Sequence, residues 1–163
     1  ASTIKVETNL LEYFKPSSTL RQELEHVESH LSGVGTVDIS LQAQERDAFR
    51  DPTNLAVVER VQSFAKTLPG VDRTISFVDF MKDMNKSFHD ENKEFYRIPD
   101  SRELVSQYLL LYDSGDMDDF ITTEYDHARI LIRISEHNSA GQARIITALR
   151  SFIEQIENNG PVH

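Results

Sequence analysis

Cysteine is absent from the 163-residue chain, which excludes thiol redox catalysis, thiolate zinc sites and disulfide bonds. The chain also has no run of Lys or Arg, and Asp plus Glu outnumber Lys plus Arg by 27 to 17, giving a formal net charge of −10. Surfaces that bind nucleic acid or anionic lipid headgroups depend on positive charge. The composition therefore argues against both classes of partner.

Long apolar runs are missing, since none approaches the roughly 18 residues that a membrane-spanning helix needs. The first five residues also lack the charged start and apolar block of a secretory signal peptide. We therefore expect any membrane attachment or export signal to lie outside these 163 residues. Apolar residues make up 39% and charged residues 27% of the chain, which is ordinary for one globular domain.

Sequence motifs of common enzymes are missing as well, because neither a Gly-x-Ser-x-Gly elbow nor a glycine-rich phosphate loop occurs. Glu124, Asp126 and His127 could form an acid–base set, but alternating polar residues are common where a strand begins. Neither a nucleophile nor a phosphate cradle can be assembled from the sequence. We expect no catalytic residue, no cofactor and no enzymatic activity.

Two places in the sequence invite a metal-binding interpretation. His26 and His30 lie four residues apart on a predicted helix, but no third ligand is evident and His26 is not followed by the glutamate of a zinc-protease helix. The acidic turn at 113–119 does not follow the ligand order of an EF-hand loop and lacks its closing glutamate. We expect surface histidines and a solvated acidic loop, with no metal ligand; a weak cation site at the turn is left open.

The spacing of apolar residues predicts alternating helices and strands. Strands are expected where apolar and polar residues alternate, at 37–41, 71–77 and 128–134. Helices are expected where apolar residues recur at spacings of three and four, at 18–31, 52–68, 77–88, 102–112 and 140–157. Asp51, Ser101 and Ser139 are the predicted caps of three of these helices.

Two of the predicted helices repeat a pattern at a distance of 88 residues. The matching positions are Val57 and Ile145, Val61 and Leu149, Ser63-Phe64 and Ser151-Phe152, and Leu68 and Ile156. Each helix follows a predicted strand and precedes a glycine and a valine, although two amphipathic helices can also resemble each other by chance. Two such units on one sheet predict an α+β fold, a ferredoxin-like split β-α-β sheet covered by helices.

The same pattern predicts one domain over residues 1–163. Its first β-α-β half is expected at 34–76, a helical insertion at 77–123 and the second half at 124–163. Only Val162 and His163 follow the glycine and proline after the last helix, so we expect the last strand to be cut short.

Four stretches carry a resemblance to a known family. They are 6–14 (VETNLLEYF) with Ser17 and Ser18 after it, 68–80 (LPGVDRTISFVDF), 96–101 (YRIPDS) followed by 107–112 (QYLLLY), and 128–134 (ARILIRI). Together they resemble the first extracytoplasmic loop of exporters of the resistance-nodulation-division (RND) superfamily, in the hydrophobe-exporter and MMPL-like branch. They cover most of the chain in the family's order, and no single motif is catalytic or strict.

The resemblance implies a porter-type domain on the periplasmic or outer face of the cytoplasmic membrane, within an integral membrane protein. Such a domain helps bind and pass apolar or amphiphilic compounds, whether lipid, hopanoid-like or drug-like, driven by a proton or ion gradient used elsewhere in the protein. Its implied partners are the transmembrane helices and second porter half of the same chain and hydrophobic small molecules; a homo-oligomer is left open. The proton-relay carboxylates of these exporters lie in transmembrane helices, so no residue here inherits that role.

Two other functions remain open at the level of sequence. One is a stand-alone ferredoxin-like regulatory domain that binds a small ligand at a dimer interface. The other, which we favour least, is a small hydrolase that uses Asp126 and His127.

Aromatic and methionine residues concentrate in the predicted insertion. Such side chains make adaptable apolar surfaces that suit varied ligands, although their ordinary role is to form a core, and we favour that role here. If any residues line a substrate path, the sequence indicates Phe77, Phe80, Met81, Met84, Phe88 and Tyr108.

Overall fold

A computed structural model of the protein describes residues 4–9, 35–112 and 115–159. Within these residues the chain forms one antiparallel sheet and four α-helices, which confirms the predicted α+β class. The strands are β1 (Ile4–Asn9), β2 (Gly35–Ala43), β3 (Val71–Ser76) and β4 (His127–Ile134). The helices are α2 (Pro52–Thr67), α3 (Phe77–Ser87), α4 (Arg102–Leu111) and α5 (Ser139–Asn158).

The strand order across the sheet is β1-β2-β4-β3. Both β2 and β3 run antiparallel to β4, so they run in the same direction on either side of it. Helix α2 connects β2 to β3, while α3 and α4 lie between β3 and β4 in the chain. Strand β1 takes the edge beside β2, with Ile4 opposite Ala43 and Asn9 opposite Asp38.

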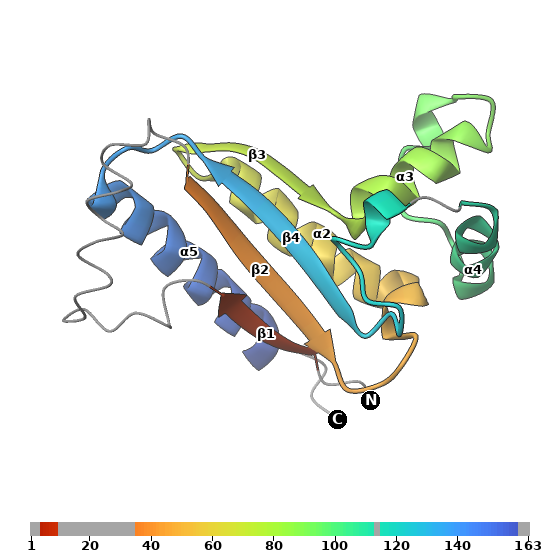
Figure 1. Ribbon diagram of the computed structural model, residues 1–163, viewed down its shortest axis with the longest axis horizontal. Coiled ribbons are helices and arrows are strands. Elements are labelled where there is room, and N and C mark those ends of the chain that lie inside the picture. Colours follow the sequence, from red (N-terminus) through yellow and green to blue (C-terminus); the bar gives the residue numbers. More distant parts are fainter. Residues whose placement is uncertain (1–3, 10–34, 113–114, 160–163) are drawn as a thin grey trace.

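Helices α2 and α5 cover one face of the sheet, and the other face is turned toward the viewer in Figure 1. The alternation along β4 explains this arrangement, since every second side chain is buried. The buried residues of β4 are Ala128, Ile130, Ile132 and Ile134, each at most 1% exposed. They pack in one core with Ile39 and Leu41 of β2, Leu55 and Val58 of α2, and Leu149 of α5.

Helix α2 begins and ends where the sequence predicts. The Asp51 carboxylate accepts a hydrogen bond from the Thr53 backbone N–H at 2.8 Å, and Pro52 is the first helical residue. After the helix, Gly70 adopts a φ of +90°, and a Cβ there would lie 3.3 Å from Ile145 and 3.1 Å from Glu136. Glycine is therefore required at the turn that leads from α2 into β3.

One predicted strand end and one predicted cap differ from the structure, each because a polar side chain caps a helix. The Ser76 hydroxyl accepts a hydrogen bond from the Val78 backbone N–H at 3.2 Å, so β3 ends at Ser76 and not at Phe77, which begins α3 as the predicted helix has it. Helix α5 is capped by Asn138 instead of Ser139, since the Asn138 side chain accepts from the Gly141 N–H at 2.6 Å.

Some predictions fall outside the described residues: the helix at 18–31 with His26 and His30, the start of the acidic turn at Asp113, and the last strand at Val162 and His163. In the part of the chain that the structure describes, no helix has the length and apolar character to cross a membrane.

Candidate interaction site on the inserted helices

The large hydrophobic side chains that are exposed in the described residues all belong to the segment between β3 and β4. They are Phe88 (53% exposed), Tyr96 (43%), Leu110 (84%) and Leu111 (68%), and we call these four residues the apolar tip. Single exposed hydrophobic residues are ordinary, but their confinement to one inserted unit suggests a surface that meets something apolar. Figure 1 shows that α3 and α4 project beyond one end of the sheet.

The insertion begins with the amphipathic helix α3, whose first turn is held by hydrogen bonds. A capping box joins Ser76 and Asp79, and the Asp79 carboxylate accepts the Ser76 backbone N–H at 2.9 Å. The helix buries one side against the core through Phe77 and Met81, both fully buried. The inserted helices are thus held in a defined place relative to the sheet.

The six residues predicted for a substrate path have different environments. Phe77, Met81, Met84 and Tyr108 are buried, between 0% and 6% exposed. Phe80 is partly buried and its ring centre lies 5.6 Å from that of Phe120. Phe88 is the exposed member. A path-lining role for these six residues stays a prediction.

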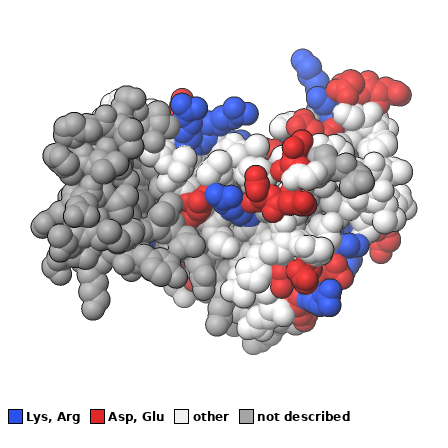
Figure 2. Space-filling view, in the orientation of Figure 1, with Lys and Arg blue, Asp and Glu red and all other residues white. Residues whose placement is uncertain are grey.

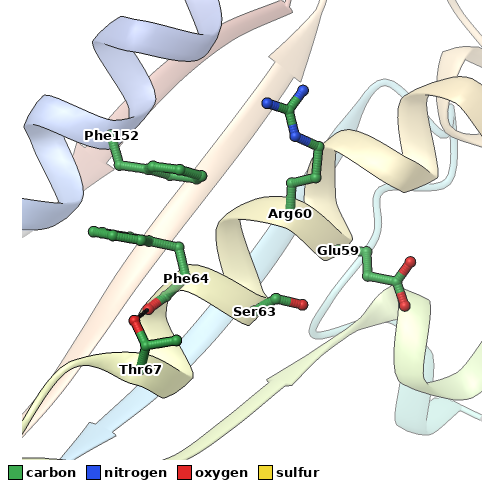
Figure 3. Close-up of a pocket in the computed structure, with 6 residues that line it drawn as sticks. All are labelled: Glu59, Arg60, Ser63, Phe64, Thr67 and Phe152. Atoms are coloured by element: carbon green, nitrogen blue, oxygen red, sulfur yellow. Dashed lines mark hydrogen bonds between the residues drawn. The ribbon is translucent and has the colours of Figure 1, made fainter.

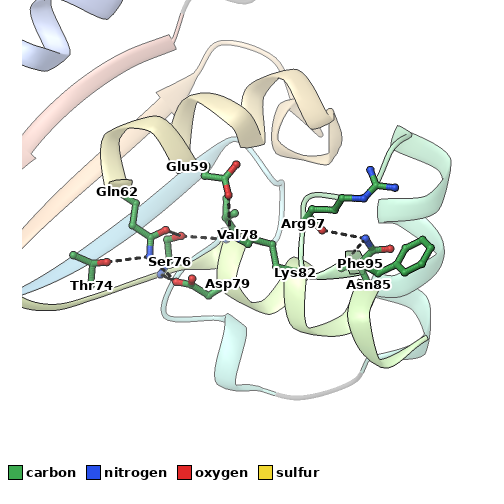
Figure 4. A network of polar contacts seen from close by, with 10 residues as sticks. All are labelled: Glu59, Gln62, Thr74, Ser76, Val78, Asp79, Lys82, Asn85, Phe95 and Arg97. Atoms are coloured by element: carbon green, nitrogen blue, oxygen red, sulfur yellow. Dashed lines mark hydrogen bonds and ion pairs between the residues drawn. The ribbon is translucent and has the colours of Figure 1, made fainter. Parts of the chain in front are cut away.

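Asn85 holds the parts of the insertion together. Its Nδ2 donates to the backbone oxygens of Phe95 at 2.9 Å and Arg97 at 3.1 Å, as Figure 4 shows. Its Oδ1 accepts from the Tyr108 hydroxyl at 2.9 Å, and Asn85 itself is 2% exposed. Burial raises the pKa of Tyr108, which keeps the hydroxyl protonated as a donor. One buried amide therefore ties α3, the following connection and α4 into one unit.

Phe88 is held in place although it is exposed. Its ring stacks on that of Tyr108, with centroids 4.8 Å apart and planes 14° apart. Because Asn85 fixes the Tyr108 hydroxyl, the exposed Phe88 ring rests on an ordered support. The apolar tip therefore presents at least one side chain in a defined position.

Tyr96 combines an exposed ring with nearby cations. The Lys82 Nζ lies 4.8 Å and the Lys86 Nζ 6.0 Å from its ring centre. Both lysines are also paired, Lys82 with Glu59 at 2.7 Å and Lys86 with Glu91 at 3.1 Å. Burial, and then the Asp83 charge, raise the pKa of Tyr96.

A buried polar cluster, which sequence reasoning missed, joins α2 to the start of α3 (Figure 4). Gln62 Nε2 donates to Asp79 Oδ2 at 2.6 Å and to Thr74 Oγ1 at 3.2 Å. The Ser76 hydroxyl donates to Gln62 Oε1 at 2.6 Å. Gln62 is 3% exposed, and its side chain is engaged by residues of the fold, so the cluster anchors the insertion. In the sequence, the signal for this cluster is that Gln62, a polar residue, lies among the apolar positions of the helix predicted at 52–68.

The candidate acid–base residues Asp126 and His127 do lie together. Asp126 Oδ1 accepts from the Thr122 hydroxyl at 2.6 Å and contacts His127 Nδ1 at 2.8 Å. The hydrogen bond from His127, and then that from Thr122, lower the pKa of Asp126. Thr122 Oγ1 also accepts the backbone N–H groups of Asp126 at 3.3 Å and His127 at 3.1 Å, so the three residues close the turn that leads into β4. Glu124 is exposed.

In the ranges that the structure describes, no group of three or more His, Asp or Glu side chains could hold a metal ion. The described part of the acidic turn forms a short 3-10 helix at Gly115–Met117.

A second surface feature is a shallow groove of about 430 Å³ on the outer side of α2 and α5 (Figure 3). Its lining residues are Glu59, Arg60, Ser63, Phe64, Thr67 and Phe152. The rings of Phe64 and Phe152 form its apolar side.

Comparison of the chain with protein-family models, with curated proteins and with solved structures gave no match.

Proposed function

We propose that this chain is a non-catalytic, porter-type domain of a membrane exporter of the RND superfamily. In this role it helps bind and pass apolar or amphiphilic compounds on the extracytoplasmic side of the membrane. The observation that carries the proposal is that, among the residues the structure describes, the exposed large hydrophobic side chains all belong to the apolar tip. An exposed apolar surface on a chain with a net charge of −10 favours contact with an apolar compound or with another apolar surface.

The strand order supports the architecture that goes with this role, a ferredoxin-like split β-α-β sheet. In that arrangement β2, α2 and β3 form the first unit, and β4 lies between its two strands. Strand β4 and helix α5 begin the second unit. Strand β1 takes the position beside β2 that the last strand of a second unit would otherwise occupy.

The proposed partners are the transmembrane helices and the second porter half of the same exporter. Helices α3 and α4 extend away from the sheet, so the apolar tip can reach a neighbouring part without disturbing the core (Figure 1). The energy for transport would come from an ion gradient used elsewhere in the full protein.

The genomic sequence around this chain tests the exporter assignment. We expect an apolar run of about 20 residues, long enough for a transmembrane helix, on each side of the domain. If the reading frame on both sides holds no such run, the exporter assignment is wrong.

Binding of the neutral apolar dye N-phenyl-1-naphthylamine tests the tip directly. We expect the dye to gain fluorescence with the wild-type chain and to lose most of that gain with the double variant Leu110→Ser and Leu111→Ser. Both side chains are more than two-thirds exposed, so the change leaves the core intact. Leu110→Met and Leu111→Met together, which conserve apolar volume, are the matched control and should bind like wild type. Equal binding by the serine and methionine variants would contradict the proposal.

A further inference from the structure

Two arginines face each other on the side of the sheet that α2 and α5 leave uncovered. Arg73 of β3 and Arg133 of β4 are paired in the sheet register. The next pair, Thr74 and Ile132, is buried against the helices, so alternation puts both arginines on the opposite face. Arg73 is exposed and the Arg133 side chain is 53% exposed. Figure 2 shows Lys and Arg side chains gathered over this part of β3 and β4.

This pairing is unfavourable for the fold alone. Like charges directly opposite each other in an antiparallel sheet destabilise it. Asp72 approaches Arg133 with 3.6 Å between Oδ2 and Nε, but both side chains are more than half exposed, so the ion pair is weak. An arginine pair in a chain with a net charge of −10 is therefore better explained by an anion that it binds.

The third arginine on this face is already neutralised. Arg129 donates from Nε and from one terminal nitrogen to the two carboxylate oxygens of Asp38, at 3.0 and 2.9 Å. Arg73 and Arg133 together with Asp72 leave one positive charge at the other end of β4. That charge matches a monoanion.

An apolar pair lies beside the arginine pair on the same face. Ile75 of β3 is opposite Leu131 of β4, and both are partly buried. Residues two positions apart on a strand lie about 7 Å apart on one face, so the two pairs form a continuous surface. We call Arg73, Ile75, Leu131 and Arg133 the open-face patch.

We propose that the open-face patch binds the carboxylate and the first methylene groups of a fatty-acid anion. A guanidinium group recognises a carboxylate through two parallel hydrogen bonds, and the neighbouring Ile75 and Leu131 side chains offer apolar contact to the start of the acyl chain. The inference rests on the proposed function, because it names the class of amphiphile that the domain handles.

Titration with the fluorescent fatty acid cis-parinaric acid, at neutral pH and below its micelle concentration, tests the assignment. We expect the wild-type chain to enhance its emission. The double variant Arg73→Gln and Arg133→Gln should raise the Kd by about ten-fold or more, because two charge-assisted contacts are lost. The matched control is Arg46→Gln with Arg144→Gln, which removes the same charge from exposed positions after β2 and on α5. It should bind like wild type.

The methyl ester of parinaric acid separates headgroup recognition from apolar binding. We expect it to bind weakly and equally to wild type and to the Arg73→Gln, Arg133→Gln variant. Unchanged binding of the free acid to that variant, or an equal loss in the control variant, overturns the inference. Circular dichroism should show folded protein for all variants. In the serine variant of Leu110 and Leu111, the affinity ratio between parinaric acid and its methyl ester should match that of wild type, because the carboxylate is recognised at the open-face patch. Loss of dye binding at the tip and loss of carboxylate recognition at the patch are therefore separate outcomes.

Discussion

Phe64 and Phe152 stack with ring centroids 4.1 Å apart and ring planes 8° apart, and they occupy matching positions of the pattern that recurs after 88 residues. The two rings join α2 to α5, the helices that cover the sheet. A similarity found in the sequence therefore has a physical counterpart: equivalent positions on the two helices meet where the helices pack side by side (Figure 3).

Removing one ring of this pair should weaken the helical layer. We expect Phe152→Ala to lower the free energy of unfolding by about 1–3 kcal/mol, from lost apolar burial and lost stacking. Urea denaturation followed by circular dichroism measures the change. Phe152→Leu should recover part of it by restoring apolar contact, and Ser151→Ala, at the exposed neighbouring position, should have little effect. A Phe152→Ala variant as stable as wild type would show that the stack is incidental.

The Gln62 cluster should be sensitive to loss of a single partner. Gln62→Leu leaves the Ser76 hydroxyl and Thr74 without their buried hydrogen bonds, so we expect a loss of about 1–3 kcal/mol. Adding Ser76→Ala to Gln62→Leu should cost less than the sum of the two single changes, since one unpaired group is removed. Chemical denaturation of the four proteins of this cycle gives the coupling energy. Strict additivity would contradict a shared network.

Asp126 should make stability depend on pH in a defined direction. Its pKa is lowered in the folded chain by His127 and Thr122, so its contribution is present above the pKa of the unfolded state, about 4, and is lost as pH falls through the folded pKa. We expect Asp126→Asn to lower the Tm at neutral pH and to match wild type in strong acid. Thermal melts across that range test this, with Glu124→Gln as a control. A constant difference between Asp126→Asn and wild type at every pH would contradict it.

We expect the arginine pair of the open-face patch to lower the free energy of unfolding while it provides the anion-binding groups. Arg73→Thr removes a like charge opposite Arg133 and places a residue of good strand propensity there, so we expect a gain of up to about 1 kcal/mol. Arg73→Lys keeps the charge and should give no gain. Denaturation midpoints compare the three chains. A loss of stability in Arg73→Thr would mean that Arg73 supports the sheet through contacts of its own.

Local patterns in the sequence predicted the local elements well. The alternation at 128–134 identified β4, and the Asp51-Pro52 start and the Pro69-Gly70 end bounded α2 to within one residue. These predictions succeeded because each depends on neighbours within one or two turns of chain.

The missed features depend on residues that are distant in the sequence. Strand β1 was not predicted, because the alternation of Ile4 and Val6 with Lys5 and Glu7 is short and the strand depends on its pairing with β2. The Gln62 cluster needs α2, β3 and α3 to be assembled first. The end of β3 at Ser76 was also missed, because Ser76 both closes the strand and caps α3 together with Asp79, and the alternation of 71–77 does not show this side-chain contact.

The central position of β4 has a consequence for the speed of folding. Its pairing with β2 brings together residues such as Asp38 and Arg129, which are 91 positions apart. Closing so long a loop costs conformational entropy before the sheet gains its main ladder, and proteins dominated by such contacts fold in milliseconds to seconds. The contacts of Asn85, by contrast, span 10 to 23 positions, so the inserted helices can assemble early. We therefore expect the entry of β4 between two strands that α2 joins to be a late step of folding.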